Sequence, residues 1–159
     1  MPMDENRQHI RPSILNRLID YEPQVSRESA QHRLLGFEEL KRFVIRDLER
    51  LLNTKGSILP VPPSCKEVNN SVFVYGLRDF TSQNPKSPSI KHQLGQDIEK
   101  TISKFEKRLK NVTVHIDTSA QDERNIKLKI TGLLILDPVA EPVSFDTYFN
   151  INRGEYTIR

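Results

Sequence analysis

The apolar positions between residues 98 and 116 follow two repeats, one after the other. The first set recurs at intervals of four, three and four residues, which makes one stripe of an amphipathic helix: Ile98, Ile102, Phe105 and Leu109. From Val112 to Ile116 the apolar side chains alternate with polar ones, which is the repeat of a half-buried strand. No Pro or Gly separates the two patterns, so the sequence predicts a helix that continues through Leu109 and passes directly into a strand.

Two charged residues, Glu106 and Arg108, lie at this junction. Residues two apart on a helix point in different directions, so we expect that these two do not pair with each other. Each charge then seeks a partner elsewhere, in this chain or in another. The alternative, which spacing alone favours, is a solvated helix end whose cations interact with the helix dipole.

The first half of the chain carries further helical patterns. Pro12 and Ser13 predict the start of a short helix over Ile14–Asp20. A stronger helix is predicted from Phe37 to about Asn53, with the following residues on one stripe: Phe37, Leu40, Val44, Leu48, Leu51 and Leu52. Ser87 as the N-cap and Pro88 as the first helical residue open the long helix that leads to the junction.

The segment between these helices has two interpretations. Leu59 to Pro63 contains three prolines and is expected to be an extended connector. Ser64 to Glu67 matches a capping box, and apolar residues follow at helical spacing: Val68, Val72 and Tyr75. This pattern favours a short helix ended by Gly76. A strand over Ser71–Tyr75 is the alternative, because its residues are common in strands.

After Leu109 the pattern is that of strands. Asn125–Leu136 alternates, and its inner row is Ile126, Leu128, Ile130, Leu134 and Leu136. Gly132 interrupts the row and indicates a bulge or a close backbone approach. Leu133 and Ile135 make the end of this strand apolar on both faces, so we expect something to cover it.

Two more strands complete the predicted sheet. The next inner row is Val143, Phe145, Thr147, Phe149 and Ile151. A turn at Asn152–Gly154 leads to a last strand, Glu155–Arg159, with Tyr156 and Ile158 pointing inward. The sequence therefore predicts an α+β fold, in which three or four helices pack on one face of a four-stranded antiparallel sheet. At 159 residues we expect one domain, with a flexible N-terminus at about 1–11.

The composition of the chain excludes several classes of protein. The 24 basic and 21 acidic residues are interleaved along the chain, with no basic block that would indicate a nucleic-acid partner. No apolar run approaches the roughly 18 residues of a membrane span, and no secretory signal is visible. Cys65 is alone, which fits a reducing compartment. The four histidines show no metal-ligand spacing, so we expect neither a metal nor a cofactor.

No pattern typical of an enzyme is present. The neighbouring carboxylates Glu38-Glu39 and Asp122-Glu123 are expected to be solvated, because adjacent side chains on a helix point apart and the second pair lies in a polar segment. A nucleophile elbow, a phosphate-binding loop and a zinc motif are all missing. Glu106 with an acidic partner such as Asp79 could form a glycosidase pair, but nothing in the sequence places the two at a working separation.

Five segments, taken in order, resemble the TssE family of type VI secretion baseplate subunits. They are Arg11–Ile19, Val44–Thr54, Ser71–Phe80, Ile98–Leu109 and Glu141–Thr147. That family is related to the wedge protein of contractile phage baseplates and is sometimes labelled lysozyme-like. Its signature is Glu-Pro-Arg, at the position where this chain has Glu106, Lys107 and Arg108. Pro would push the preceding residue out of the helical region, so Lys107 leaves the geometry of the junction open.

The resemblance implies a non-enzymatic part of the baseplate at the cytoplasmic face of the inner membrane. TssE-like subunits sit in the wedge with TssF and TssG, beside TssK, and are thought to start polymerisation of the TssB–TssC sheath around the Hcp tube. Two other classes stay open, a regulatory binding module of the anti-adaptor kind and a peptidoglycan hydrolase. No direct membrane insertion is expected.

The resemblance also selects the candidate site residues. We expect Glu106, Lys107 and Arg108 to contact TssF and TssG, with the charges paired across the contact. The terminal strand, with Tyr156 and Ile158, would offer an unpaired edge on which an incoming sheath strand can continue the sheet. The alternative is an edge covered within the monomer.

Overall fold

The structure is a computed structural model that describes residues 18, 23, 24, 36–84, 87–117, 125–136 and 139–159. The expected helix over Ile14–Asp20 lies outside this range except for Leu18, and so does the N-terminus at 1–11. The helices are α2 (Phe37–Asn53), α3 (Lys66–Asn69), the 3-10 helix η2 (Val72–Val74) and α4 (Pro88–Phe105). The strands are β1 (Leu109–Ile116), β2 (Asn125–Leu136), β3 (Val139–Asn150) and β4 (Glu155–Ile158).

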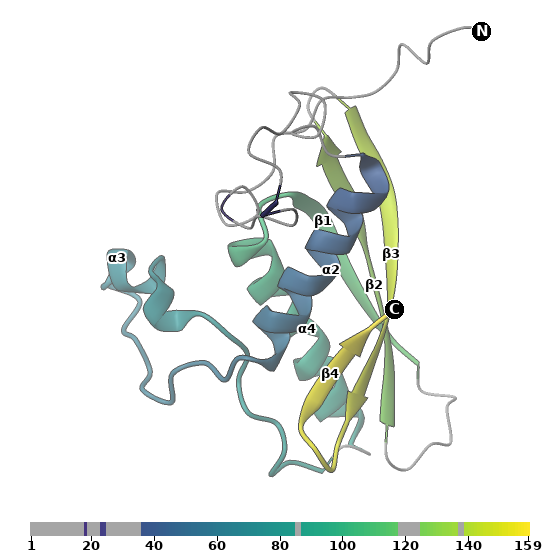
Figure 1. Ribbon diagram of the computed structural model, residues 1–159. Coiled ribbons are helices and arrows are strands. Elements are labelled where there is room, and N and C mark those ends of the chain that lie inside the picture. The colour runs from purple at the N-terminus through teal and green to yellow at the C-terminus, as the bar shows by residue number, and fades with distance from the viewer. Residues whose placement is uncertain (1–17, 19–22, 25–35, 85–86, 118–124, 137–138) are drawn as a thin grey trace, which may run out of the picture.

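The four strands form one antiparallel sheet in the order β1-β2-β3-β4, and α2 and α4 cover one face of it (Figure 1). This confirms the predicted α+β fold. The connection that carries α3 and η2 projects away from the two layers (Figure 1). Within the described part of the chain, no helix is long and apolar enough to cross a membrane.

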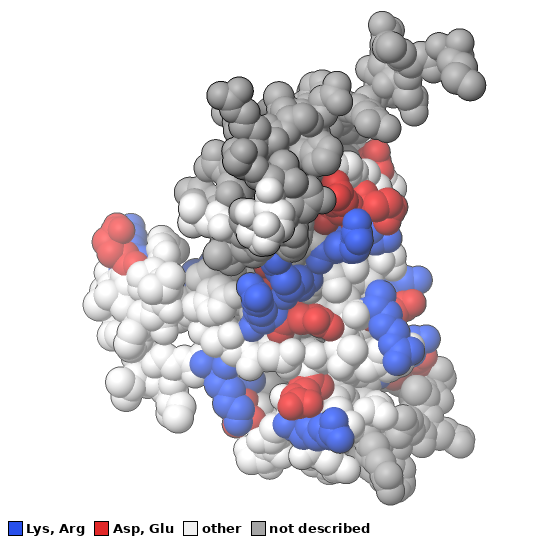
Figure 2. Space-filling view, in the orientation of Figure 1, with Lys and Arg blue, Asp and Glu red and all other residues white. Residues whose placement is uncertain are grey.

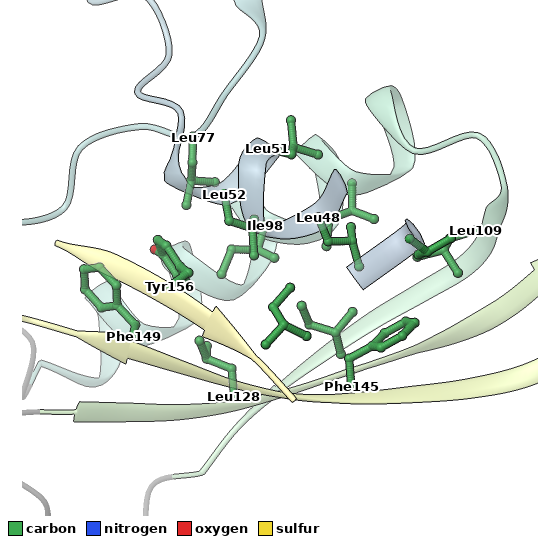
Figure 3. Packing of buried hydrophobic residues seen from close by; sticks show 14 of the residues in the cluster. Leu48, Leu51, Leu52, Leu77, Ile98, Leu109, Leu128, Phe145, Phe149 and Tyr156 are labelled. Atoms are coloured by element: carbon green, nitrogen blue, oxygen red, sulfur yellow. The ribbon is translucent and has the colours of Figure 1, made fainter. Parts of the chain in front are cut away.

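The core lies between the two helices and the inner face of the sheet. From α2 it takes the stripe predicted from the sequence, with Val44 and Leu48 fully buried. Leu48, with Ile98 of α4, faces Leu128 and Phe145 of the sheet (Figure 3). The helical repeat and the strand repeat were therefore each assigned to the correct face.

Helix α4 ends earlier than the sequence predicted. Its last residue is Phe105, and Glu106 leaves the helical region with φ −104° and ψ 84°. Leu109 is the first residue of β1 and is buried there. The prediction of a helix through Leu109 was wrong, because the buried start of the strand happens to continue the helical spacing.

The segment after the prolines is also different. In place of one helix from Val68 to Tyr75, the structure has a single turn of α3 and a separate turn of η2. The Ser64 side chain forms no cap, since the helix starts after Cys65 and no side chain bonds there. The alternative strand is not formed either. Packing explains this, because Val72 is 85% exposed and contributes nothing to a buried face.

Gly132 confirms the close approach expected from the sequence. A Cβ at this position would lie 3.1 Å from the Lys110 carbonyl oxygen. On the facing strand the register shifts between Lys110 and Thr113, and Asn111 there has a φ of 51°. The bulge therefore belongs to β1, and the glycine makes room for it.

Candidate protein-interaction surfaces

The junction between α4 and β1 is held by an ion pair that the expected helical spacing had ruled out. Arg108 Nε donates to Glu106 Oε1 at 2.7 Å, and a second guanidinium nitrogen of Arg108 bonds the other Glu106 oxygen. The Arg108 backbone N–H also donates to Glu106 Oε1, at 3.1 Å. The two residues can face each other because the helix has already ended, so the rule for helical spacing does not apply to them.

A third charge comes from α2. The Arg108 guanidinium donates to Asp47 Oδ2 at 2.7 Å, which ties the junction to a helix 61 positions away in the chain. Glu106 is only 7% exposed. Burial acts to lower the pKa of Arg108, but its bonds to Glu106 and then Asp47 outweigh burial and raise it. The charges of Arg108 and Glu106 are thus satisfied inside this chain, which makes the pair a structural lock.

An open pocket of about 330 Å³ lies beside this lock. Tyr75 and Phe105 line it and meet edge to face, with 5.0 Å between ring centroids. Burial, followed by the charges of Asp47 and Glu106, raises the pKa of the Tyr75 hydroxyl. Lys107 also lines the pocket, and it is exposed. The pocket therefore offers aromatic walls and one exposed cation.

The outer edge of β4 is occupied by α2. Arg159 and Asp146 exchange two backbone bonds, so Tyr156 and Ile158 are the residues whose backbone faces away from β3. The Tyr156 N–H donates to Asn53 Oδ1 at 2.7 Å, and Asn53 Nδ2 donates to the Tyr156 carbonyl at 2.9 Å. The Ile158 N–H donates to Glu49 Oε1 at 2.8 Å.

The expectation of an unpaired edge on the terminal strand was therefore wrong at these three backbone groups. The inward placement of the two side chains is confirmed, since Tyr156 is 5% and Ile158 is 6% exposed. Tyr156 stacks on Phe149, with ring centroids 4.5 Å apart. A part for either residue in a protein contact stays a prediction.

The opposite edge of the sheet, β1, borders an open groove of about 590 Å³. The Asp117 N–H donates to the Lys127 carbonyl, so the backbones of Val114 and Ile116 face away from β2 and toward the groove. Among the described residues, one side chain bonds to these outward groups, since the Val114 N–H donates to Glu99 Oε1 at 2.7 Å. Lys91, His92 and Gly95 of α4 form the other wall.

The residues that close these edges and the junction were not predicted from the sequence: Asp47, Glu49, Asn53 and Glu99. Each is a polar residue on a helix that also carries an apolar stripe, and in a sequence such residues look like solvated ones. One signal was present, because all four residues lie in segments that carried the family resemblance.

The candidate catalytic carboxylates that the structure describes face solvent or bond to separate basic partners. Glu38 and Glu39 are exposed in the first turn of α2, where Glu39 accepts a bond from the Gly36 N–H. Asp122 and Glu123 lie outside the described residues. Asp79 bonds to Lys55 and Thr81, which together hold the pKa of its carboxyl well below the usual value. No group of three or more potential metal ligands occurs within the described ranges.

The chain is similar to a known protein family and to a chain of a solved structure. Residues 38–139 match the family described as baseplate wedge protein gp25. Among solved structures, a chain from "The baseplate complex from the type VI secretion system" is 22% identical, with a TM-score of 0.46. That similarity covers 70% of this chain and 94% of the other. No curated protein matches the chain.

Proposed function

The chain belongs to the baseplate wedge protein gp25 family, and on this basis we propose that it is a non-enzymatic structural subunit of a type VI secretion baseplate. In this proposal it binds TssF and TssG beside TssK, at the cytoplasmic face of the inner membrane. It also gives the first TssB–TssC subunits a surface on which to start the sheath around Hcp. The family match carries the proposal, because its range contains all of α2 after Phe37, the whole of α4 and the locked junction.

The proposed wedge contact lies at the junction. The roles of Glu106 and Arg108 there differ from those that the sequence suggested. Glu106 and Arg108 form an ion pair with each other, so they fix the shape of the surface. Lys107 and the aromatic pocket contact the partner. Lys107 is exposed between the two locked residues. An exposed cation next to an aromatic pocket suits a partner side chain that is apolar at its tip and flanked by an acidic residue.

Co-expression with TssF and TssG tests this function. We expect the wild-type chain to co-purify with them and Lys107→Glu to co-purify poorly, with an unchanged melting temperature because the side chain is exposed. Arg108→Ala is a less clean variant, because it leaves a buried carboxylate without its partner and lowers stability as well. A wild-type chain that binds neither subunit would refute the wedge assignment. If that chain cleared peptidoglycan in a zymogram, the hydrolase class would replace it.

The start of the sheath is proposed at the β1 edge, and not at the β4 edge that the sequence suggested. The β4 edge is closed by three bonds from two side chains of α2. From the residues that the structure describes, the β1 edge receives one such bond, from Glu99, and it lies beside the 590 Å³ groove. An extended segment bonded to Val114 and Ile116 would place alternate side chains in that groove, as in other cases of strand addition.

A further inference from the structure

The loop from Gly56 to Gly76, called the apolar loop below, presents large apolar side chains to solvent. Ile58 is 98% exposed, Val72 is 85% exposed and Leu59 is 70% exposed. Single exposed apolar residues are common, but several gathered on one projecting segment mark an interaction surface. The loop stands away from the two-layer body in Figure 1, so these side chains do not contribute to the core.

The apolar loop is built to hold its shape. Its two ends are joined in a parallel bridge, in which the Gly56 N–H donates to the Leu77 carbonyl and the Leu77 N–H to the Thr54 carbonyl, both at 2.8 Å. Gly76 has a φ of +105°, and a Cβ there would lie 2.4 Å from the Thr54 oxygen. Only glycine fits this position, so the neck of the loop is specified by the sequence.

Further bonds fix the loop internally and attach it to α4. The Asn69 side chain donates to the Pro62 carbonyl at 2.9 Å and to the Cys65 carbonyl at 3.1 Å, which ties the proline-rich arm to α3. The Asn69 carbonyl in turn accepts a bond from Lys104 of α4. Ordering costs on binding are small for a surface that is already held in this way.

The chemistry of the loop selects the kind of partner. Between Gly56 and Gly76 the only charged residues are Lys66 and Glu67, and Figure 2 shows a mostly white lobe with charge near one tip. A surface for anionic phospholipid or nucleic acid would carry a cluster of cations, which this loop lacks. Its prolines are exposed, have fixed φ angles and donate no backbone bond. Such segments dock in apolar grooves lined by aromatic side chains.

We propose that the apolar loop inserts into an uncharged, aromatic-lined groove of a neighbouring protein subunit. The loop is continuous with the junction, because Tyr75 at its end contacts Phe105 and lines the junction pocket. One partner therefore covers both surfaces. This inference rests on the proposed function for the identity of its neighbour and adds the loop as a second, apolar anchor.

The test uses substitutions of exposed apolar residues and co-expressed TssF–TssG. Ile58→Ser with Val72→Ser, the loop pair, removes the two most exposed apolar side chains of the loop. Val139→Ser is the control on the sheet, where the side chain is 40% exposed. The loop pair should weaken the complex by about tenfold or more, as loss of central anchors does, while Val139→Ser leaves it unchanged. Melting curves identify any variant that fails to fold.

Cys65 gives a second measurement, because it is the chain's one cysteine and is exposed within the loop. Its alkylation should be at least several times slower in the wild-type complex than in the free chain. Suppose that the wild type binds TssF–TssG. If the loop-pair variant then binds as tightly as the wild type, or if Cys65 is alkylated as fast in the complex as in the free chain, the loop proposal is overturned and the proposed function stands. If the wild type does not bind them, the proposed function has failed instead.

Parallel measurements on the purified chain test two other binding partners of the apolar loop, a membrane and a second copy of the chain. Co-sedimentation with phosphatidylethanolamine–phosphatidylglycerol vesicles that the loop pair abolishes would make the loop a membrane anchor. A dimer in sedimentation velocity that the loop pair abolishes would make a second copy the occupant. Either result overturns the proposal of a groove on a different subunit, and we expect neither.

Discussion

The side chain of Asn53 bonds the backbone of Tyr156 in both directions, although the two residues are 103 positions apart. The amide nitrogen donates to the Tyr156 carbonyl at 2.9 Å, and the amide oxygen accepts from its N–H at 2.7 Å. Asn53 thus takes the place of a neighbouring strand at the edge of the sheet. With Glu49 on the same helix it closes this edge against pairing with another chain.

Asn53→Ala should lower the free energy of unfolding by about 1–3 kcal/mol, because it leaves two half-buried backbone groups of Tyr156 without partners. Arg42→Ala on the same helix is the control, since Arg42 is exposed and should change stability by less than about 0.5 kcal/mol. Urea unfolding of the wild type and the two variants measures these changes in the free energy of unfolding. Equal midpoints would mean that water replaces the Asn53 bonds at no cost.

Lys107→Pro should be tolerated, with a change in unfolding free energy below about 1 kcal/mol. Helix α4 ends at Phe105, and Glu106 at φ −104° and ψ 84° already lies outside the helical region that a following proline disfavours. No described backbone bond uses the Lys107 N–H. Proline here also restores the Glu-Pro-Arg signature of the TssE family.

The control for this substitution is Ser103→Pro, which lies inside the last turns of α4 and is exposed. It should cost about 3 kcal/mol or more, because proline removes a helical bond and clashes with the preceding turn. Thermal melts of both variants are sufficient. A large drop for Lys107→Pro would mean that the junction needs the Lys107 backbone in a conformation that proline cannot adopt.

Stability at high pH should depend on Tyr156. Burial, and to a lesser degree the charge of Asp79, raises the pKa of its hydroxyl above the ordinary value. The unfolded chain therefore loses this proton before the folded chain does. The contribution of the Tyr156 hydroxyl to stability is complete below about pH 10. Above that pH, this group lowers the free energy of unfolding by about 1.4 kcal/mol per pH unit.

Tyr156→Phe keeps the stacked ring and removes the titrating group. Its unfolding free energy should fall less steeply than that of the wild type between pH 10 and 11, in roughly the range where unfolded tyrosine titrates. Denaturant titrations at several pH values measure the slopes, and identical slopes for wild type and Tyr156→Phe would contradict the assignment.

The sequence predicted the layers of this fold well and its polar contacts poorly. Burial on one face leaves a repeat in the chain, so α2 and the inner rows of β2 and β3 could be read directly. The resemblance to baseplate wedge subunits, also drawn from sequence segments, is confirmed by the family match. The end of α4 could not be predicted, since Leu109 continues the helical spacing although it starts a strand.

The polar contacts could not be predicted from the sequence, for a different reason. Glu49, Asn53 and Glu99 bond to backbone groups on strands far away in the sequence, and backbone groups carry no residue type that could signal the pairing. The mutual pairing of Glu106 and Arg108 depends on where the helix ends, so one misplaced boundary reversed that conclusion. Local repeats determine which face is buried, and edge closure depends on tertiary geometry.

The proposed sheath start at β1 predicts opposite behaviour for two glutamates with the same chemistry. Glu99 and Glu49 each accept a bond from an outward N–H, of Val114 on β1 and of Ile158 on β4. An added strand on β1 must displace Glu99. Glu99→Ala removes that competing bond, worth about 1 kcal/mol, so the affinity for purified TssB–TssC should rise about three- to tenfold.

Glu49→Ala is the matched control and should leave this affinity unchanged, because Asn53 still closes the β4 edge. Glu99→Gln should resemble the wild type, since the glutamine oxygen can accept the same bond from Val114. Biolayer interferometry with immobilised chain measures all four proteins. Equal gains for Glu99→Ala and Glu49→Ala would show that the two edges are equally open. A gain for Glu49→Ala alone would return the sheath start to the terminal strand.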